Sequence, residues 1–420
     1  MNSKPPRLSP ELLALIGEGF LSRLSFGLIS FGLPLYAHHL GMSLTSIGVL
    51  FSLNAITSVA LKPYFGRLAD RFGLKNSLSL SIGARSVLAL LIAFSGSAWQ
   101  LYAIRLLHGM IESLRDPSIN ALLAERGGEK TVASAFSWYF TARYTASALG
   151  KTAAGLLLAW TASNYMFVFL CAFVLSILPL YVVLRYVKQE ERHSPRTESV
   201  PVPNGVPAAP PGRHKPILAF AGFGFLITST STMLNSLFPL LATQYAGLTE
   251  AQAGIIFGIS TLLMTIAGPV FGWLSDNVSR KLVLLVRSAA NTISSLLYLI
   301  FPGFAGVAVG KVVDDVGKAA FRPAWGALMA RISSVDRSRR AEMMGTMTVG
   351  ENLGETLGPV LGGFLWGSFG APVLLITRAV LALGAELYAV FIVDPRVNAM
   401  AADVQKPAAV PRIEPPEEED

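Results

Sequence analysis

The stretch Gly66-Arg-Leu-Ala-Asp-Arg-Phe-Gly-Leu-Lys75 places four charged side chains between two long apolar runs. A related stretch, Gly272-Trp-Leu-Ser-Asp-Asn-Val-Ser-Arg-Lys281, follows at an offset of 206 residues (272 minus 66). The same offset carries Asp70 onto Asp276 and the final lysine of the first stretch onto that of the second. The chain is therefore predicted to contain two copies of one unit, each with a short charged loop at one face of a membrane.

Both stretches resemble a motif of the major facilitator superfamily of transporters, Gly-x-Leu-x-Asp-Arg-x-Gly-Arg-Lys, found between the second and third helices of that family. The first copy departs from it at Leu74, and the second at Asn277 and Ser279. The resemblance implies two helical bundles that open alternately to the two sides of the membrane. It also implies that the two loops act as a conformational latch on the cytoplasmic side, formed by Gly66, Asp70, Arg71, Gly73, Lys75, Gly272, Asp276, Arg280 and Lys281.

The composition indicates a membrane protein. Of 420 residues, 52% are apolar and only 14% are charged, against roughly 25% charged residues in soluble domains. A net charge of +8 would suggest a nucleic-acid partner in a soluble protein, but here the basic residues gather in loops between apolar runs. The single cysteine, Cys171, excludes an internal disulfide and a thiolate metal site, so no metal is expected.

Twelve segments are long enough to cross a bilayer at about 20 residues per crossing. The prediction is an all-α integral membrane protein with twelve transmembrane helices in two pseudo-symmetric six-helix bundles. The bundles span 1–187 and 216–393, a proline-rich cytoplasmic linker spans 188–215, and 394–420 is an acidic tail expected to be disordered. The predicted helices cover 11–36, 45–65, 76–96, 99–124, 132–160, 165–187, 216–243, 250–271, 281–301, 304–330, 340–367 and 370–393.

The distribution of lysine and arginine predicts the orientation, because cytoplasmic loops retain these residues. They occupy the loops near 66–75, 125–130, 188–215, 280–281 and 331–340, whereas the alternate loops carry none. Both termini and the linker are therefore expected in the cytoplasm. The expected location is the plasma membrane, which is the inner membrane in a bacterium.

Two of the predicted helices each carry five charged or titratable residues in their interiors. Each such charge costs about 3 kcal/mol at a helix centre, so exposure to lipid is implausible. In each helix the charged positions fall in an arc about 100° wide, which defines one polar face. These residues are Arg105, His108, Glu112, Arg115 and Asp116 in 99–124, and Lys311, Asp314, Asp315, Lys318 and Arg322 in 304–330.

The stretch from Arg105 to Gly109 also resembles the Arg-x-x-x-Gly motif of the family's fourth helix. In many proton-coupled members that arginine is linked to proton transfer, which makes Arg105 a functional candidate. An interhelical ion pair that only holds the bundle together is an equal alternative. Further candidates for the substrate or proton pathway are Glu18, Arg23, Arg143, Lys151, Glu351, Glu355, Arg378 and Glu386.

Among these residues, Lys151 is the one expected to face an anion. A carboxyl group in a medium of low dielectric constant can exchange a proton near neutral pH, so Glu18, Glu112 and Glu351 are the expected proton carriers. The alternative for any one of them is a structural pair. For Glu112 that alternative is a pair with Arg115, which lies within one turn of it.

The segment Gly358-Pro-Val-Leu-Gly-Gly363 resembles the family's Gly-Pro-x-x-Gly-Gly pattern, whose small residues permit close helix contact. That pattern marks exporters when it lies in the fifth helix. Here the fifth helix reads Gly150-Lys-Thr-Ala-Ala-Gly155 without the proline, which weakens the interpretation as a drug antiporter.

Soluble-enzyme chemistry is not supported, because the chain lacks a Walker loop, a His-Glu-x-x-His motif and a Gly-x-Ser-x-Gly motif. We therefore expect no enzyme activity and no cofactor. The function predicted is secondary active transport of a small polar, charged solute, coupled to protons, by a monomer in the lipid bilayer without a nucleic-acid partner. The alternatives are a drug or metal-ion exporter of the same family and a transport-inactive sensor or scaffold. The substrate and the direction of transport stay open.

Overall fold

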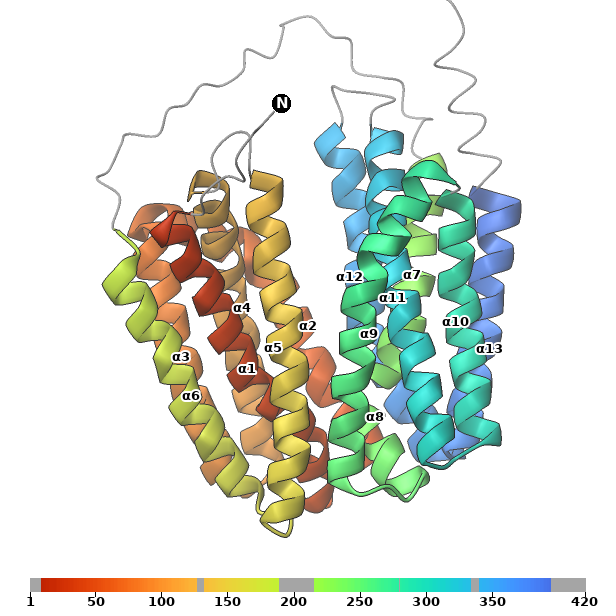
Figure 1. Ribbon diagram of the computed structural model, residues 1–420, viewed down its shortest axis with the longest axis horizontal. Helices are drawn as coiled ribbons and strands as arrows, with labels where there is room; N and C mark the ends of the chain where they lie inside the picture. The colour runs from red at the N-terminus through yellow and green to blue at the C-terminus, as the bar shows by residue number, and fades with distance from the viewer. Residues whose placement is uncertain (1–8, 127–131, 189–214, 279, 334–339, 394–420) are drawn as a thin grey trace, which may run out of the picture.

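The computed structural model describes residues 9–126, 132–188, 215–278, 280–333 and 340–393, and this part of the chain is helical without strands (Figure 1). Almost all of the predicted linker and the whole predicted tail lie outside the described residues. Within the helices, the side chains of five predicted site residues also lie outside the described part: Asp70, Asp276, Arg280, Lys281 and Arg322.

The predicted helices are present in the predicted order. The first half contains α1 (Pro10–His39), α2 (Leu44–Phe72), α3 (Leu74–Phe94), α4 (Ala98–Arg126), α5 (Val132–Trp160) and α6 (Tyr165–Tyr186). The second half contains α7 (Lys215–Asn235), α8 (Phe238–Leu240), a π-helix η1 (Leu241–Tyr245), α9 (Glu250–Asn277), α10 (Arg280–Ile300), α11 (Phe304–Ser333), α12 (Arg340–Phe369), α13 (Ala371–Tyr388) and a π-helix η3 (Ala389–Val393).

The seventh predicted segment, 216–243, is not one continuous helix. It divides into α7, α8 and η1, with a break after Asn235. Pro239 lies in the first turn of α8 and has no backbone N–H to donate to the carbonyl of Asn235, so the α-helical ladder cannot continue there. This break brings Phe238 and Leu241 into the buried core near one end of the bundle.

The charged stretch at 66–75 is not a loop, which corrects the sequence-based prediction. Residues up to Phe72 continue α2, and α3 starts at Leu74. Only Gly73 separates the helices, with φ of 88°, a conformation that glycine adopts without the steric cost of a side chain. Likewise, the second copy lies at the end of α9 and the start of α10. Polar helix ends can project beyond the hydrocarbon core, where water replaces lipid.

Seven of the described helices have a window long and apolar enough to cross a membrane by composition alone. They are α1, α2, α3, α6, α7, α9 and α13. The charged helices α4 and α11 are not among them. These helices can cross the bilayer only if their polar faces pack inside the bundles.

The two halves form two bundles that lie side by side and diverge toward the top of Figure 1. We name the top, where α1 begins and α2 ends, the basic face, and the bottom, where α1 ends and α9 begins, the opposite face. Near the opposite face one hydrophobic cluster contains buried residues of both bundles, including Leu33, Leu158, Phe257 and Trp366. The remaining clusters each belong to one bundle, for example Leu15 and Leu122 in the first and Phe220 and Met347 in the second. The protein is therefore closed at the opposite face, while the bundles have separate cores toward the basic face.

Glycines permit the close helix crossings that close the opposite face. A Cβ atom built on Gly155 of α5 would lie 2.3 Å from the carbonyl oxygen of Glu250 in α9. One built on Gly48 of α2 would lie 2.3 Å from the carbonyl oxygen of Pro359 in α12. Because these neighbours are backbone atoms, a side chain at either glycine would push the bundles apart. The segment from Gly358 to Gly363 thus lies at a crossing between the two halves, as its small residues predict.

Candidate functional site

A buried ion pair joins α1 to α4 in the first bundle. Arg115 Nη2 donates a hydrogen bond to Glu18 Oε1 at 2.7 Å, and both side chains are almost completely buried. Ser22 donates to the same carboxylate oxygen at 2.8 Å, and the guanidinium also contacts the Tyr139 hydroxyl at 3.1 Å. The predicted alternative of a pair between Glu112 and Arg115 is therefore wrong, because the arginine turns toward α1 rather than along its own helix.

Glu112 instead belongs to a second polar group shared by α4 and α2. Asn54 Nδ2 donates to Glu112 Oε2 at 2.8 Å, while Asn54 Oδ1 lies 2.7 Å from His108 Nδ1. The imidazole of His108 stacks on Phe26, with ring centres 5.3 Å apart. Asn54 therefore links the two candidates. Sequence reasoning missed it, although an amide inside the apolar segment 45–65 was an available signal.

Several arginines of the first bundle have aromatic neighbours instead of carboxylates. Arg23 lies 4.9 Å from the centre of the Phe26 ring, and Arg105 lies 4.9 Å from that of Phe51. Arg143 lies 5.3 Å from the Tyr139 ring centre. Each contact supplies about 0.5–2 kcal/mol of cation–π attraction. None of these arginines forms an ion pair within the described residues, so the interior of this bundle has an excess of positive charge.

Arg85 of α3 is a further buried cation that sequence reasoning missed. Its guanidinium donates to the backbone carbonyl of Ser22 and lies 5.5 Å from the Phe26 ring centre. The signal was a single arginine inside the apolar segment 76–96. Asp116, in contrast, pairs with Lys62 of α2 at 3.1 Å, and both side chains are partly exposed. The residues of the predicted polar face of the fourth helix thus contact different neighbouring helices.

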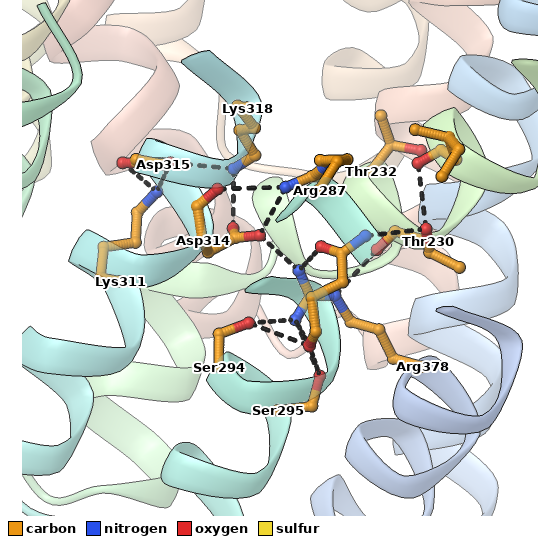
Figure 2. A network of polar contacts seen from close by, with 12 residues as sticks. Thr230, Thr232, Arg287, Ser294, Ser295, Lys311, Asp314, Asp315, Lys318 and Arg378 are labelled. Atoms are coloured by element: carbon orange, nitrogen blue, oxygen red, sulfur yellow. Dashed lines mark hydrogen bonds and ion pairs between the residues drawn. The ribbon is translucent and has the colours of Figure 1, made fainter. Parts of the chain in front are cut away.

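In the second bundle, charged side chains of α10, α11 and α13 form one network (Figure 2). Asp314 accepts hydrogen bonds from Arg378 at 2.7 Å, from Lys318 at 2.8 Å and from Arg287 at 3.2 Å. Asp315 accepts from Lys311 at 2.6 Å and from Lys318 at 2.9 Å. Four cations share two carboxylates, so this network also carries an excess of positive charge.

Arg378 holds the network to the helices around it. Its side chain is completely buried and donates to the Thr230 carbonyl at 2.8 Å and to the Asn291 side-chain oxygen at 2.7 Å. It also donates to Ser294 and Ser295, at 3.0 and 2.8 Å. Arg287 and Asn291 were not among the predicted residues. Their positions in the apolar segment 281–301 were the available signal.

The remaining acidic candidates lie on α12 and α13. Glu351 accepts a hydrogen bond from Trp325 Nε1 of α11. Glu355 is exposed and Glu386 is half-buried. Glu351 is thus half-buried and bound to a neighbouring helix, whereas the side chain of Glu355 is accessible to solvent.

A cluster of cations and aromatic rings lies where the two bundles meet. Lys151 of α5 places its Nζ atom 4.4 Å from the ring centre of Phe257, on α9 of the other bundle. Lys311 of α11 lies 4.9 Å from the same ring centre and 5.1 Å from that of Phe238. Phe31 of α1 packs edge-on against Phe257, with centroids 5.9 Å apart. The predicted candidates Lys151 and Lys311 are therefore brought together from opposite halves of the chain.

The predicted latch is described only in part. Arg71 and Gly73 are exposed at the basic face. Lys75 Nζ donates to the carbonyl of Leu184 in α6 at 3.3 Å, so this lysine is bound within its own bundle. A latch between the halves stays a prediction.

Comparisons with known proteins agree with this architecture. The family profile described as Major Facilitator Superfamily matches residues 19–229 and 218–414. The multidrug resistance protein MdtG of Proteus mirabilis is 27% identical over 298 residues, which cover 68% of this chain and 72% of that protein. MdtG of Escherichia coli K12 is 25% identical over 274 residues, covering 63% of this chain and 66% of its own length, just under two thirds.

Among solved structures, a mutant of the nucleoside transporter NupG superposes with a TM-score of 0.75 at 16% identity, over 93% of this chain and 99% of that one. A proton dependent oligopeptide transporter gives a TM-score of 0.74 at 13% identity, over 94% and 99%. At these identities the likeness concerns the fold alone.

Proposed function

The chain belongs to the Major Facilitator Superfamily of membrane transporters, and from that premise we propose that it moves a small charged solute across the membrane by alternating access, coupled to protons. The proposal includes the orientation predicted from the basic residues, with both termini in the cytoplasm of a bacterial cell. The basic face is then cytoplasmic, and the described state is closed to the outside.

The observation that carries the proposal is that the two bundles pack against each other at the opposite face and have separate cores toward the basic face. At the opposite face α2 contacts α12 and α5 contacts α9, and one core contains residues of both halves. Toward the basic face the cores are separate. A transport cycle needs a second state in which the contacts at the opposite face break and those at the basic face form.

Charged groups at the interior support a charged solute and proton coupling. Glu112 accepts a hydrogen bond from the amide of Asn54 and forms no direct ion pair within the described residues, so it can gain or lose a proton without breaking one. Glu18 already pairs with Arg115, and protonation there would leave a buried arginine uncompensated. Glu112 is therefore the favoured proton carrier in the first bundle.

Drug export is the second candidate, and the names of the MdtG relatives favour it. These proteins match about two thirds of this chain at about a quarter identity. The absence of proline between Gly150 and Gly155 weighs against it. The two candidates differ in solute and direction but share the same cycle.

The test combines a cross-link with a solute panel. Ser163 Oγ and Glu250 Oε1 lie 2.8 Å apart across the closed face, in different bundles. In a Cys171→Ser background, cysteines at both positions can be joined by a short thiol cross-linker. Purified protein is reconstituted in vesicles loaded with the pH indicator pyranine, and organic anions, organic cations and neutral solutes are added in turn.

We expect at least one class of solute to drive proton movement in the reduced protein, and we expect the cross-link to abolish it reversibly. A matched control joins cysteines at Ser43 and Ser46, whose hydroxyl oxygens lie 2.9 Å apart within the first bundle. This control cross-link should leave the flux unchanged. Proton movement that continues with the closed face locked, or no response to any solute, would contradict the proposed cycle.

A further inference from the structure

Lys151 forms no direct ion pair in the described part of the structure. Its ammonium group lies over the ring of Phe257, and Asp315, the acidic group that attracts it from a distance, is already bound to Lys311 and Lys318. The side chain is half-buried rather than sealed. An ammonium group is rarely left uncompensated inside a bundle, because removal of its hydration shell costs several kcal/mol. The structure thus presents a cation without a direct anionic partner.

Lys311 supplies a second ammonium group beside the same ring. Both nitrogens lie within 5 Å of the centre of Phe257, so they can be no farther apart than the sum of those two distances. They come from different bundles, and their repulsion opposes the approach of the two halves. A negative charge between them would turn this repulsion into an attraction.

Lys311 can turn toward a ligand without leaving Asp315 unpaired. It now donates to both oxygens of Asp315, at 2.6 and 2.7 Å. Lys318 also donates to Asp315, at 2.9 Å, so this carboxylate keeps a cationic partner if Lys311 moves away. The shared carboxylate therefore acts as an internal substitute for an external anion.

The aromatic rings next to the two lysines indicate that such a ligand also has an apolar, aromatic part. Phe257 packs edge-on against Phe31 and Phe238, with centroids 5.9 and 5.0 Å away. All three rings are buried in the cluster that closes the opposite face. A ligand that reaches the two ammonium groups therefore also lies beside apolar rings. A carboxylate suits two lysines, since its two oxygens can accept from both.

We infer that Lys151 and Lys311 form an anion site shared by the two bundles, which takes a small aromatic carboxylate against Phe257. This site rests on the proposed function, because it names the class of solute that the transporter accepts. The binding site itself does not require transport. Binding at both lysines links the halves and favours their closure around the ligand.

The experiment compares three probes that share a ring and differ in charge: benzoate, benzamide and benzamidine. Thermal unfolding of the purified full-length protein in detergent is followed as each probe is titrated, since a ligand of the folded state raises the melting temperature by mass action. We expect benzoate to stabilise the parent protein and the other two to leave it unchanged.

Three variants test whether benzoate stabilises the protein by binding at Lys151. Lys151→Gln removes an ammonium group that forms no described ion pair, so the protein should still fold. Its apparent affinity for benzoate should fall at least about tenfold, which corresponds to the usual free energy of a charge-assisted hydrogen bond. Lys151→Arg restores the charge and should restore binding. Lys62→Gln is the matched control, because it removes the same group from the exposed pair with Asp116 and should bind benzoate as the parent does.

The inference is overturned if benzamidine or benzamide stabilises as well as benzoate, if none of the probes stabilises, or if Lys151→Gln retains the parent affinity. Failure here is distinct from failure of the proposed function. Solute-driven proton movement without benzoate binding would keep the transporter and remove this site. Benzoate binding through Lys151 without any proton movement would keep the site and contradict the proposed coupled transport.

Discussion

Asp314→Asn tests whether the network of the second bundle is held by one carboxylate. The side chain is 4% exposed and accepts hydrogen bonds from Arg287, Lys318 and Arg378. Loss of one partner from a buried ion pair costs about 3–5 kcal/mol. Arg378 keeps its neutral acceptors and Lys318 keeps Asp315, so we expect the lower end, about 3 kcal/mol of unfolding free energy.

The assay is reversible unfolding in mixed micelles with increasing denaturing detergent, monitored by helical circular dichroism. Asp116→Asn is the matched control, because it makes the same chemical change in a partly exposed pair with Lys62. That change should cost less than about 1 kcal/mol. Equal effects of the two substitutions, or a loss below about 1 kcal/mol for Asp314→Asn, would refute the view that buried ion pairing holds this bundle.

Three further outcomes are expected. Gly155→Ala should open the closed face, because the new Cβ meets a backbone oxygen. Gly268→Ala should not, because no atom lies within 4 Å of its Cβ position. Single cysteines in the shared core should react faster with a thiol reagent in the first variant than in the second. Glu112→Gln should keep solute exchange but lose proton-driven accumulation and its pH dependence in vesicles, and unchanged accumulation would pass the role to Glu351 or Glu18. A membrane-impermeant thiol reagent applied to whole cells should label a cysteine at His39 and not one at Asn76, and the reverse pattern would invert the proposed orientation.

The sequence by itself determined the order of the helices and the polar face of each charged helix, but not the break after Asn235 or the continuation of α2 to Phe72. Residue periodicity depends only on helix geometry, so the arcs around Arg105 and Lys311 could be read without a structure. The 206-residue repeat indicated two related halves, because the same motif recurs at one constant offset. The glycines from Gly358 to Gly363 indicated a close crossing, because only small side chains permit one.

Only the tertiary structure decided which charges meet. Glu18 pairs with Arg115 at a separation of 97 residues, and Asp314 meets Arg378 at 64. Periodicity assigns a residue to a face of its helix but does not say which helix lies opposite. That choice depends on the order and rotation of helices in each bundle, which is why the nearer Glu112 was the wrong partner for Arg115.

The meeting of Lys151 and Lys311 was equally beyond the sequence. Each residue was a candidate alone, but their shared ring, Phe257, looked like any apolar residue of its helix. Their proximity exists because the two bundles are closed at one face in this state. Contacts between the bundles reflect a balance of packing and charge over the whole interface, and that balance differs between conformations of a single sequence.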